Sequence, residues 1–153
     1  MNTSNKPFFS EYDDAYPTCE KTYATLCIYL PDQCNPGIIT DKLGIKPTRT
    51  QIKGEVHQGV VKQWPTAWFL SSEGCVESKD VRRHVDWLIE HLSDKEEIVH
   101  QLQASGNEID ISCYWLSSTG NGGPALSPNT MRKLAELDIR IWFDVYFDDT
   151  MEA

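Results

Sequence analysis

Two aspartates and two arginines are the residues of this chain whose types suit acid–base or metal chemistry. Asp110 and Asp144 each occur in an apolar segment in which every second residue is aliphatic. If these segments are neighbouring strands, both carboxylates project from one sheet face, where they could exchange protons or bind a divalent cation. No third ligand is specified, and Arg49 or Arg140 could instead neutralise one carboxylate. We favour an ion pair or a solvated carboxylate, and we expect no metal and no cofactor.

A glycine-rich loop over residues 117–124 separates a predicted strand from a predicted helix, where phosphate-binding loops often occur. Ser127 and Pro128 suit the first positions of that helix. The centre of the loop reads Gly-Asn-Gly-Gly, which matches neither the dinucleotide-binding pattern nor a Walker loop. We therefore interpret the glycines as a tight turn with positive φ rather than as an anion site.

The histidines and cysteines show no spacing typical of a metal site or a nucleophile. His84 and His91 share a predicted helix face with Trp87, but seven residues place them roughly 10 Å apart along the axis, too far for one ion. The five cysteines contain no Cys-x-x-Cys pair, the spacing on which zinc ribbons and thioredoxin-type sites depend. We expect reduced thiols that pack as small hydrophobic side chains. No catalytic residue is predicted.

The composition is that of an ordinary globular domain with an acidic surface. The chain has 153 residues, 40% of them hydrophobic, and a formal net charge of −9, which fits one domain with its own core. Without a segregated basic patch, this charge argues against nucleic acid and favours a basic partner protein. No apolar run approaches the roughly 20 residues that cross a bilayer. We therefore expect no membrane association and a cytoplasmic location.

Hydrophobic periodicity and turn residues divide the chain into strands and helices. The longest helical stripe carries Val81, Val85, Leu88 and Leu92 at spacings of four, three and four residues. A capping-box sequence over residues 93–96 predicts a kink or restart after it. Strands are predicted over residues 22–30, 66–71, 109–116 and 140–147, with a weak strand between 46 and 61, and helices over 36–43, 81–105 and a segment from Ser127.

This order of elements predicts an α+β fold, namely a ferredoxin-like βαββαβ unit with an added αβ unit. Helices should cover one face of a mainly antiparallel sheet. We divide the chain into an N-terminal arm (1–21), a single α+β domain (22–147) and an acidic tail (148–153). The arm carries four aromatic residues, so it either lies extended on the domain with its rings docked or is a disordered terminus.

Alternation along the predicted strands sorts their side chains into two sheet faces. One face is aliphatic and must meet the helices, whereas the other mixes tyrosine and tryptophan with charged groups, as interfaces and ligand surfaces do. The candidate binding face comprises Arg49, Trp68, Asp110, Ser112, Tyr114, Arg140, Trp142, Asp144 and Tyr146. The alternative is that the arm and the loop over residues 48–62 simply cover this face.

Five segments also resemble the sequences of a known family, namely residues 24–29, 44–50, 68–72, 84–92 and 109–124. The most distinctive are Ser-Cys-Tyr-Trp at 112–115, Gly-Asn-Gly-Gly-Pro at 120–124 and Trp-Phe-Asp-Val-Tyr at 142–146. They resemble the bacterial family catalogued as domain of unknown function 4279, over about residues 22–147. This resemblance implies a small bacterial cytoplasmic domain of unassigned activity, and it transfers no catalytic residue.

Two functional hypotheses follow from these patterns. The first is a non-enzymatic protein-interaction module that binds a partner or self-associates, as a dimer, through the Tyr/Trp-rich face. By analogy, small domains of this sort sometimes act as immunity or accessory proteins beside toxin genes. The alternative is a small enzyme or ligand-binding domain with a carboxylate/arginine pocket on the same face. The missing catalytic motif favours the first hypothesis.

Overall fold

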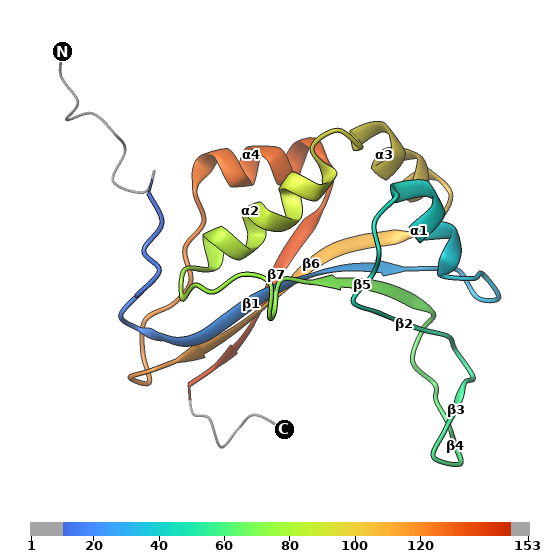
Figure 1. The fold of residues 1–153 in the computed structure, drawn as a ribbon, viewed down its shortest axis with the longest axis horizontal. Coiled ribbons are helices and arrows are strands. Elements are labelled where there is room, and N and C mark those ends of the chain that lie inside the picture. The colour runs from blue at the N-terminus through green and yellow to red at the C-terminus, as the bar shows by residue number, and fades with distance from the viewer. Residues whose placement is uncertain (1–10, 148–153) are drawn as a thin grey trace.

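The computed structural model describes residues 11–147 of the chain (Figure 1). The elements follow in the order β1 (Cys19–Tyr29), α1 (Gly37–Leu43), β2 (Arg49–Gln51), β3 (Val56–His57), β4 (Val60–Val61), β5 (Ala67–Ser71), α2 (Val81–Leu92), α3 (Glu96–Ala104), β6 (Glu108–Ser117), α4 (Pro128–Glu136) and β7 (Arg140–Tyr146). No helix within the described range is long and apolar enough to span a membrane.

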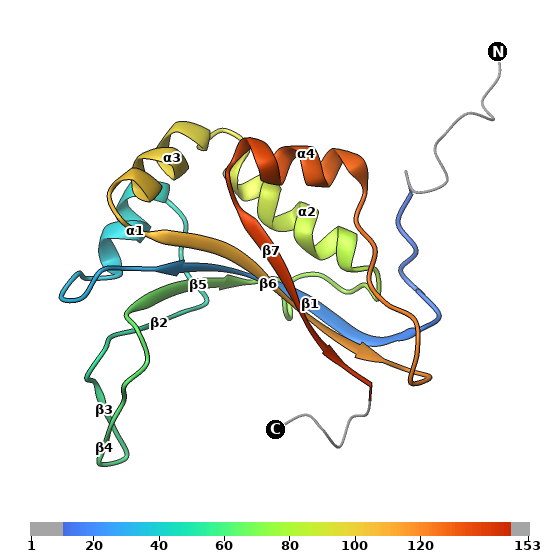
Figure 2. The same ribbon diagram turned by 180° about the vertical axis from the view of Figure 1, so that it is seen from behind.

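Five of the strands form one sheet in the order β2-β5-β1-β6-β7. Every neighbouring pair is antiparallel except β6 and β7, which are parallel. The helices of the described chain all lie on one side of this sheet, and the opposite side has no helix over it (Figures 1 and 2). The predicted α+β class and the mainly antiparallel sheet with helices on one face are confirmed.

The hydrophobic core lies between the sheet and the helix layer. Leu26 and Ile28 of β1, Ile111 of β6, and Val85 and Leu88 of α2 are at most 1% exposed. Their alternation along the strands and their spacing of three on the helix place them on facing surfaces. Each buried aliphatic side chain of this size contributes roughly 1.5–3 kcal/mol to folding. This core fixes the side of the sheet that the helices cover.

The helical region breaks where the sequence predicts a restart. α2 ends at Leu92 and α3 begins at Glu96. The predicted capping box does not form, because Lys95 occupies the N-cap position and no side chain caps α3. Ser93 instead donates from Oγ to the carbonyl oxygen of Glu90. Ser93 therefore closes α2 rather than starting α3.

The predicted weak strand between residues 46 and 61 becomes three short strands. β2 pairs with β5 at the sheet edge, and β3 and β4 form a separate hairpin. Gln58 and Gly59 both have positive φ, of 51° and 78°, as a tight two-residue hairpin turn requires. The hairpin extends from the β2 side of the sheet away from the helices (Figure 1).

The described part of the N-terminal arm packs on the helix layer. The backbone N–H of Asp13 donates to Asp80 Oδ2 at the start of α2. Tyr16 donates its hydroxyl hydrogen to the carbonyl oxygen of Gly123, and Ser118 N–H donates to the carbonyl oxygen of Thr18. Residues 11–18 therefore bridge α2 and the β6–α4 loop. The aromatic residues at positions 8 and 9, which the sequence analysis counted in the arm, lie outside the described residues.

Candidate functional site

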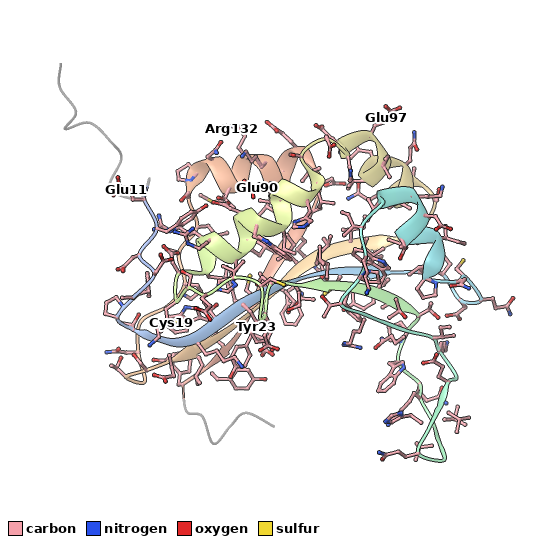
Figure 3. The ribbon with its side chains drawn as sticks, viewed as in Figure 1. Glu11, Cys19, Tyr23, Glu90, Glu97 and Arg132 are labelled. Atoms are coloured by element: carbon pink, nitrogen blue, oxygen red, sulfur yellow. The ribbon has the colours of Figure 1, made fainter. Side chains whose placement is uncertain are left out.

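The sheet surface opposite the helices is called the open face here. The strand register assigns to it Arg49 and Gln51 of β2, Ala67, Phe69 and Ser71 of β5, Lys21, Tyr23, Thr25, Cys27 and Tyr29 of β1, Glu108, Asp110, Ser112, Tyr114 and Leu116 of β6, and Arg140, Trp142, Asp144 and Tyr146 of β7. Tyr23 projects on this side, whereas Glu90, Glu97 and Arg132 project from the helices (Figure 3). Eight of the nine residues predicted for the binding face lie here.

Trp68 was assigned to the wrong face. It lies opposite Ile28 in the register, so both side chains point toward the helices, and Trp68 is fully buried. Its Nε1–H donates to Thr40 Oγ1 at 3.0 Å. A shift of one residue moves a strand side chain to the other face, and the sequence prediction started this strand in the wrong phase. Phe69 takes the place on the open face that was predicted for Trp68.

Asp110 forms the ion pair that the sequence analysis favoured. Its Oδ2 lies 3.2 Å from Nη2 of Arg140, which is directly opposite in the β6–β7 register. The other oxygen, Oδ1, is buried and accepts no hydrogen bond within residues 11–147. Burial and the nearby Asp110 carboxylate raise the pKa of Cys27 to about 12. Cys27 is therefore a protonated thiol at neutral pH and a poor nucleophile.

Asp144 lies too far from Asp110 for joint chemistry. Tyr114 stands opposite Asp144, and Arg140 stands opposite Asp110, so four residues along the strands separate the two carboxylates. At 3.3 Å per residue this is about 13 Å. Asp144 instead accepts a hydrogen bond from the hydroxyl of Tyr146 at 3.1 Å. The two aspartates do not form the acid–base or metal pair that their sequence positions allowed.

Three tyrosines form a stack at one end of the open face. The ring of Tyr114 is nearly parallel to that of Tyr23 at a centroid distance of 5.0 Å, and Tyr146 lies 5.3 Å away on a tilt. Lys21 places its Nζ 5.6 Å from the centroid of the Tyr23 ring. Tyr114 is only 8% exposed because its neighbours cover it. A partner would therefore contact Tyr23 and Tyr146, which are half-buried, more than Tyr114.

A second aromatic group lies at the other end of the open face. Phe69 meets Tyr29 edge to face at 6.1 Å, and the guanidinium of Arg49 lies 4.1 Å from the centroid of the Phe69 ring. Arg49 is thus held over an aromatic ring by a cation–π contact. Phe69 was not predicted for this face because the alternation of β5 was placed in the wrong phase, although its pairing with Cys27 follows once the register is known.

Small hydroxyl side chains separate these two aromatic groups. Ser71, Thr25 and Ser112 lie in one row across β5, β1 and β6, and Trp142 ends the row on β7. The three small residues are half-buried, whereas Trp142 is 42% exposed. An accessible centre bordered by aromatic rings resembles the composition of protein interfaces, where Tyr and Trp supply most contact energy.

Neither the described part of the arm nor the loop over residues 48–62 lies over the open face. The arm contacts α2, and the loop forms β2 and the outward hairpin. The expectation that these two segments cover the face is wrong for residues 11–18 and 48–62. Within residues 11–147, Tyr23, Trp142 and Tyr146 therefore remain accessible to a partner, whereas Phe69 and Tyr114 are only 7% and 8% exposed.

His84 and Ser72 form the closest approach to a catalytic pair, but both are buried. Ser72 Oγ lies 2.6 Å from His84 Nδ1, and Nε2 lies 2.8 Å from the carbonyl oxygen of Ser78. Ser72 Oγ also accepts from the N–H of Ala24. Burial lowers the pKa of His84, so a neutral ring accepts from Ser72 and donates to Ser78. The pair joins α2 to the sheet.

The glycine-rich loop packs against the arm. Gly120 and Gly122 have positive φ, as predicted. A Cβ atom at Gly122 would lie 2.4 Å from Thr18 Oγ1, so the missing side chain makes room for the arm. Ser127 is the N-cap residue of α4 and Pro128 its first residue, but no side chain caps the helix.

Comparison with known proteins identifies the chain by family alone. No curated protein and no solved structure matches it significantly. The model of the family described as Domain of unknown function (DUF4279) matches residues 20–148, which include every described strand and helix except the first residue of β1. The predicted resemblance is confirmed, and the chain belongs to the DUF4279 family.

Proposed function

We propose that this chain is a non-enzymatic protein-interaction module whose open face binds a partner protein. The observation that carries the proposal is the sheet face itself, which presents Trp142, Tyr23 and Tyr146 around a row of small hydroxyl residues. Aromatic anchors of this kind dominate binding energy in protein interfaces. The proposal includes a cytoplasmic bacterial setting, in which free cysteines such as the five of this chain are the usual state.

The proposal also retains the ferredoxin-like assignment for the first six main elements. The order β2-β5-β1-β6, with antiparallel neighbours throughout, supports a βαββαβ unit. β7 then joins the β6 edge through α4. In such an arrangement one sheet face is left for binding, because both crossover helices lie on the other.

The distribution of charge over the surface indicates which kind of partner protein to expect. The open face carries three cationic residues, Lys21, Arg49 and Arg140, and three carboxylates, those of Glu108, Asp110 and Asp144, so the face itself is close to neutral. The negative charge is concentrated elsewhere, for example in a cleft of about 510 Å³ beside α2 whose carboxylates are those of Asp14, Glu77, Asp86 and Glu90. We expect the net charge of −9 to attract a basic protein at long range. Aromatic contact on the open face would then hold it.

The alternative hypothesis of an enzyme or ligand-binding domain has less support. Its carboxylates are about 13 Å apart along the strands, and Asp110 is neutralised by Arg140. The thiol on the same face is protonated at neutral pH, with a pKa of about 12. An immunity or accessory role remains an analogy, which the products of neighbouring genes can test.

The test is a single lysine placed at the centre of the open face. Thr25→Lys introduces a long cation between the two aromatic groups, whereas Met131→Lys adds the same charge at a 49% exposed position of α4. We expect proteins encoded by neighbouring genes, tested one at a time by titration calorimetry, to include one that binds the wild-type chain and Met131→Lys equally. Thr25→Lys should weaken that binding by roughly tenfold or more, because hot-spot contacts lie near the interface centre.

Unchanged affinity in Thr25→Lys would contradict the proposal, provided that both variants unfold at the wild-type temperature. Loss of binding in both variants would point to a helix-side contact or a general charge effect. If no neighbouring gene product binds the folded wild-type chain, the immunity or accessory role is contradicted.

A further inference from the structure

We propose that two copies of this chain pair through β7, edge to edge and antiparallel, in a register centred on Trp142. Within residues 11–147, β7 is the last strand of the sheet and pairs on one side only, with β6. It lies at the front edge of the sheet in Figure 2. Such an edge is a template for another strand. The proposal concerns this edge and does not depend on the partner-binding role of the open face.

β7 lacks four of the features by which proteins commonly block a sheet edge, namely short length, lysine, proline and bulges. It does carry two charged residues, Arg140 and Asp144, but they are of opposite sign and can pair with each other across two copies. β7 has seven residues, Arg-Ile-Trp-Phe-Asp-Val-Tyr, without lysine or proline, and its pairing with β6 shows no register shift. The opposite edge differs, because β2 has only three residues before the chain turns into the hairpin. The structure therefore protects one edge and leaves the other suitable for pairing.

The pleat limits the registers that two β7 strands can adopt. Directly opposite residues in an antiparallel pair point to the same face, so open-face residues must meet open-face residues. With Trp142 opposite its own copy, Arg140 stands opposite Asp144 of the second copy. The twofold symmetry repeats this contact, which gives two ion pairs across one interface. Arg140 carries five donors, so it can bind this carboxylate while retaining Asp110.

Neighbouring registers are less favourable. A shift of two residues one way places Asp144 opposite Asp138 of the second copy, and like charges in that position destabilise a strand pair. A shift the other way places Arg140 opposite Tyr146 and Asp144 opposite Trp142, which leaves both charges without an opposite partner. Charge complementarity therefore selects the register centred on Trp142.

The helix side of β7 is also self-complementary in this register. Ile141 stands opposite Phe143 of the second copy, and both residues are half-buried at the edge of the core. Pairing would cover the apolar surface of these two side chains that is still exposed. Burial of apolar surface is the main favourable contribution to most protein association. Both sides of the strand thus favour the same alignment of two copies.

The first experiment reverses each charge separately and then mixes the two variants. Arg140→Asp places two carboxylates opposite each other at both contacts, and Asp144→Arg places two guanidinium groups there. Sedimentation equilibrium from low to high micromolar concentration should show a wild-type dimer and roughly tenfold or more weaker self-association of each variant. An equimolar mixture should dimerise like the wild type. In the mixed dimer, the introduced aspartate meets the introduced arginine at one contact, and native Arg140 meets native Asp144 at the other.

The second experiment tests the centre of the register directly. Trp142→Cys, in a Cys75→Ser background that removes the exposed native thiol, should form an intermolecular disulfide when copper-phenanthroline is the oxidant, because opposite residues lie within reach of a bridge. Met131→Cys on the exposed side of α4 in the same background is the control. It should crosslink much less at equal concentration.

A wild-type chain that remains monomeric at high micromolar concentration would overturn the proposal. So would a dimer that neither charge variant weakens, or a mixture no more associated than its two components. Circular dichroism and melting temperature establish that each variant is folded, and the Trp142→Cys crosslink remains decisive if Arg140→Asp unfolds through repulsion from Asp110. Thr25→Lys should still dimerise, which separates failure here from failure of the open-face proposal.

Discussion

Arg82 and Asp80 form an ion pair that is almost completely removed from water, and replacing Arg82 by methionine tests its role in holding the arm. The two side chains are 6% and 2% exposed, with Nη2 at 2.6 Å from Oδ2. Nη2 also donates to the carbonyl oxygen of Glu11. Methionine keeps much of the aliphatic stem but removes every one of these donors. The arm would then lose its contact with α2 at Glu11.

The expected loss is about 3 kcal/mol of the free energy of unfolding, near the lower end of the range of about 3–5 kcal/mol for breaking a buried pair by removing one partner. The lower end applies because two backbone donors remain on Asp80, the N–H groups of Arg82 and Asp13. Arg83→Met is the matched control. Arg83 pairs with Asp14, but these side chains are 41% and 54% exposed. Such exposed pairs contribute about 0–1 kcal/mol.

Urea unfolding of the wild type and both variants at neutral pH measures the difference. With a slope of roughly 1–3 kcal/mol/M, a loss of about 3 kcal/mol lowers the midpoint by roughly 1–3 M, whereas Arg83→Met should change it little. Burial alone would raise the pKa of Asp80, but hydrogen bonds from Arg82 and from the N–H of Asp13 hold it below 3.8. The stability from this group is therefore fully present at neutral pH and is lost only as pH falls below that value.

Equal losses in the two variants, within about 1 kcal/mol, would refute this account of the buried pair. Limited proteolysis supplies a second readout. Cleavage near Glu11 should become faster in Arg82→Met at a urea concentration where the domain remains folded. If cleavage near Glu11 is no faster in Arg82→Met than in the wild type, the Arg82 guanidinium does not hold the arm.

Two further predictions concern the same layer of the molecule. Burial lowers the pKa of His84, so the unfolded chain binds a proton on this residue more readily than the folded chain does. The free energy of unfolding should therefore fall as pH drops below about 6.5, by up to ~1.4 kcal/mol per pH unit. His84→Gln should flatten this slope in urea titrations, and His91→Gln is the matched control. Gly122→Ala should cost about 2 kcal/mol or more, because φ is +85° and the new Cβ meets Thr18. Gly123→Ala has open space and should cost under about 0.5 kcal/mol. A flat wild-type pH profile would contradict the first prediction, and equal thermal shifts in the two alanine variants would contradict the second.

The sequence predicts the sheet well wherever alternation is unbroken over many residues. β6 spans ten residues and β7 seven, and in both strands apolar residues occupy every second position from Ile109 to Trp115 and from Ile141 to Val145. Such long patterns leave one phase that buries the aliphatic set. The open-face positions of Asp110, Tyr114, Trp142 and Asp144 follow from that phase alone.

The errors occur where the pattern is short or the partner is distant. β5 has only five residues, and the first four, Ala-Trp-Phe-Leu, are all apolar, so its sequence shows no alternation from which a phase could be read, and Trp68 was placed on the wrong face. The sequence also does not predict that Arg82 is buried in the core, because arginine is rarely fully buried unless it is paired. Its arm contact is with Glu11, 71 residues away along the chain. No local pattern predicts such a contact.

Trp142 belongs to both proposed surfaces, and this decides which substitutions can separate them. Its side chain ends the row of small residues on the open face, and its backbone lies in the β7 edge, at the centre of the proposed register. Trp142→Ala would therefore weaken partner binding and self-association together, whichever is real. Thr25 lies two strands away from β7, so Thr25→Lys changes the open face but not the β7 edge. The mixture of Arg140→Asp and Asp144→Arg restores the edge pairing, although each chain still carries an altered charge on its open face. Each of these experiments therefore tests one proposal independently of the other.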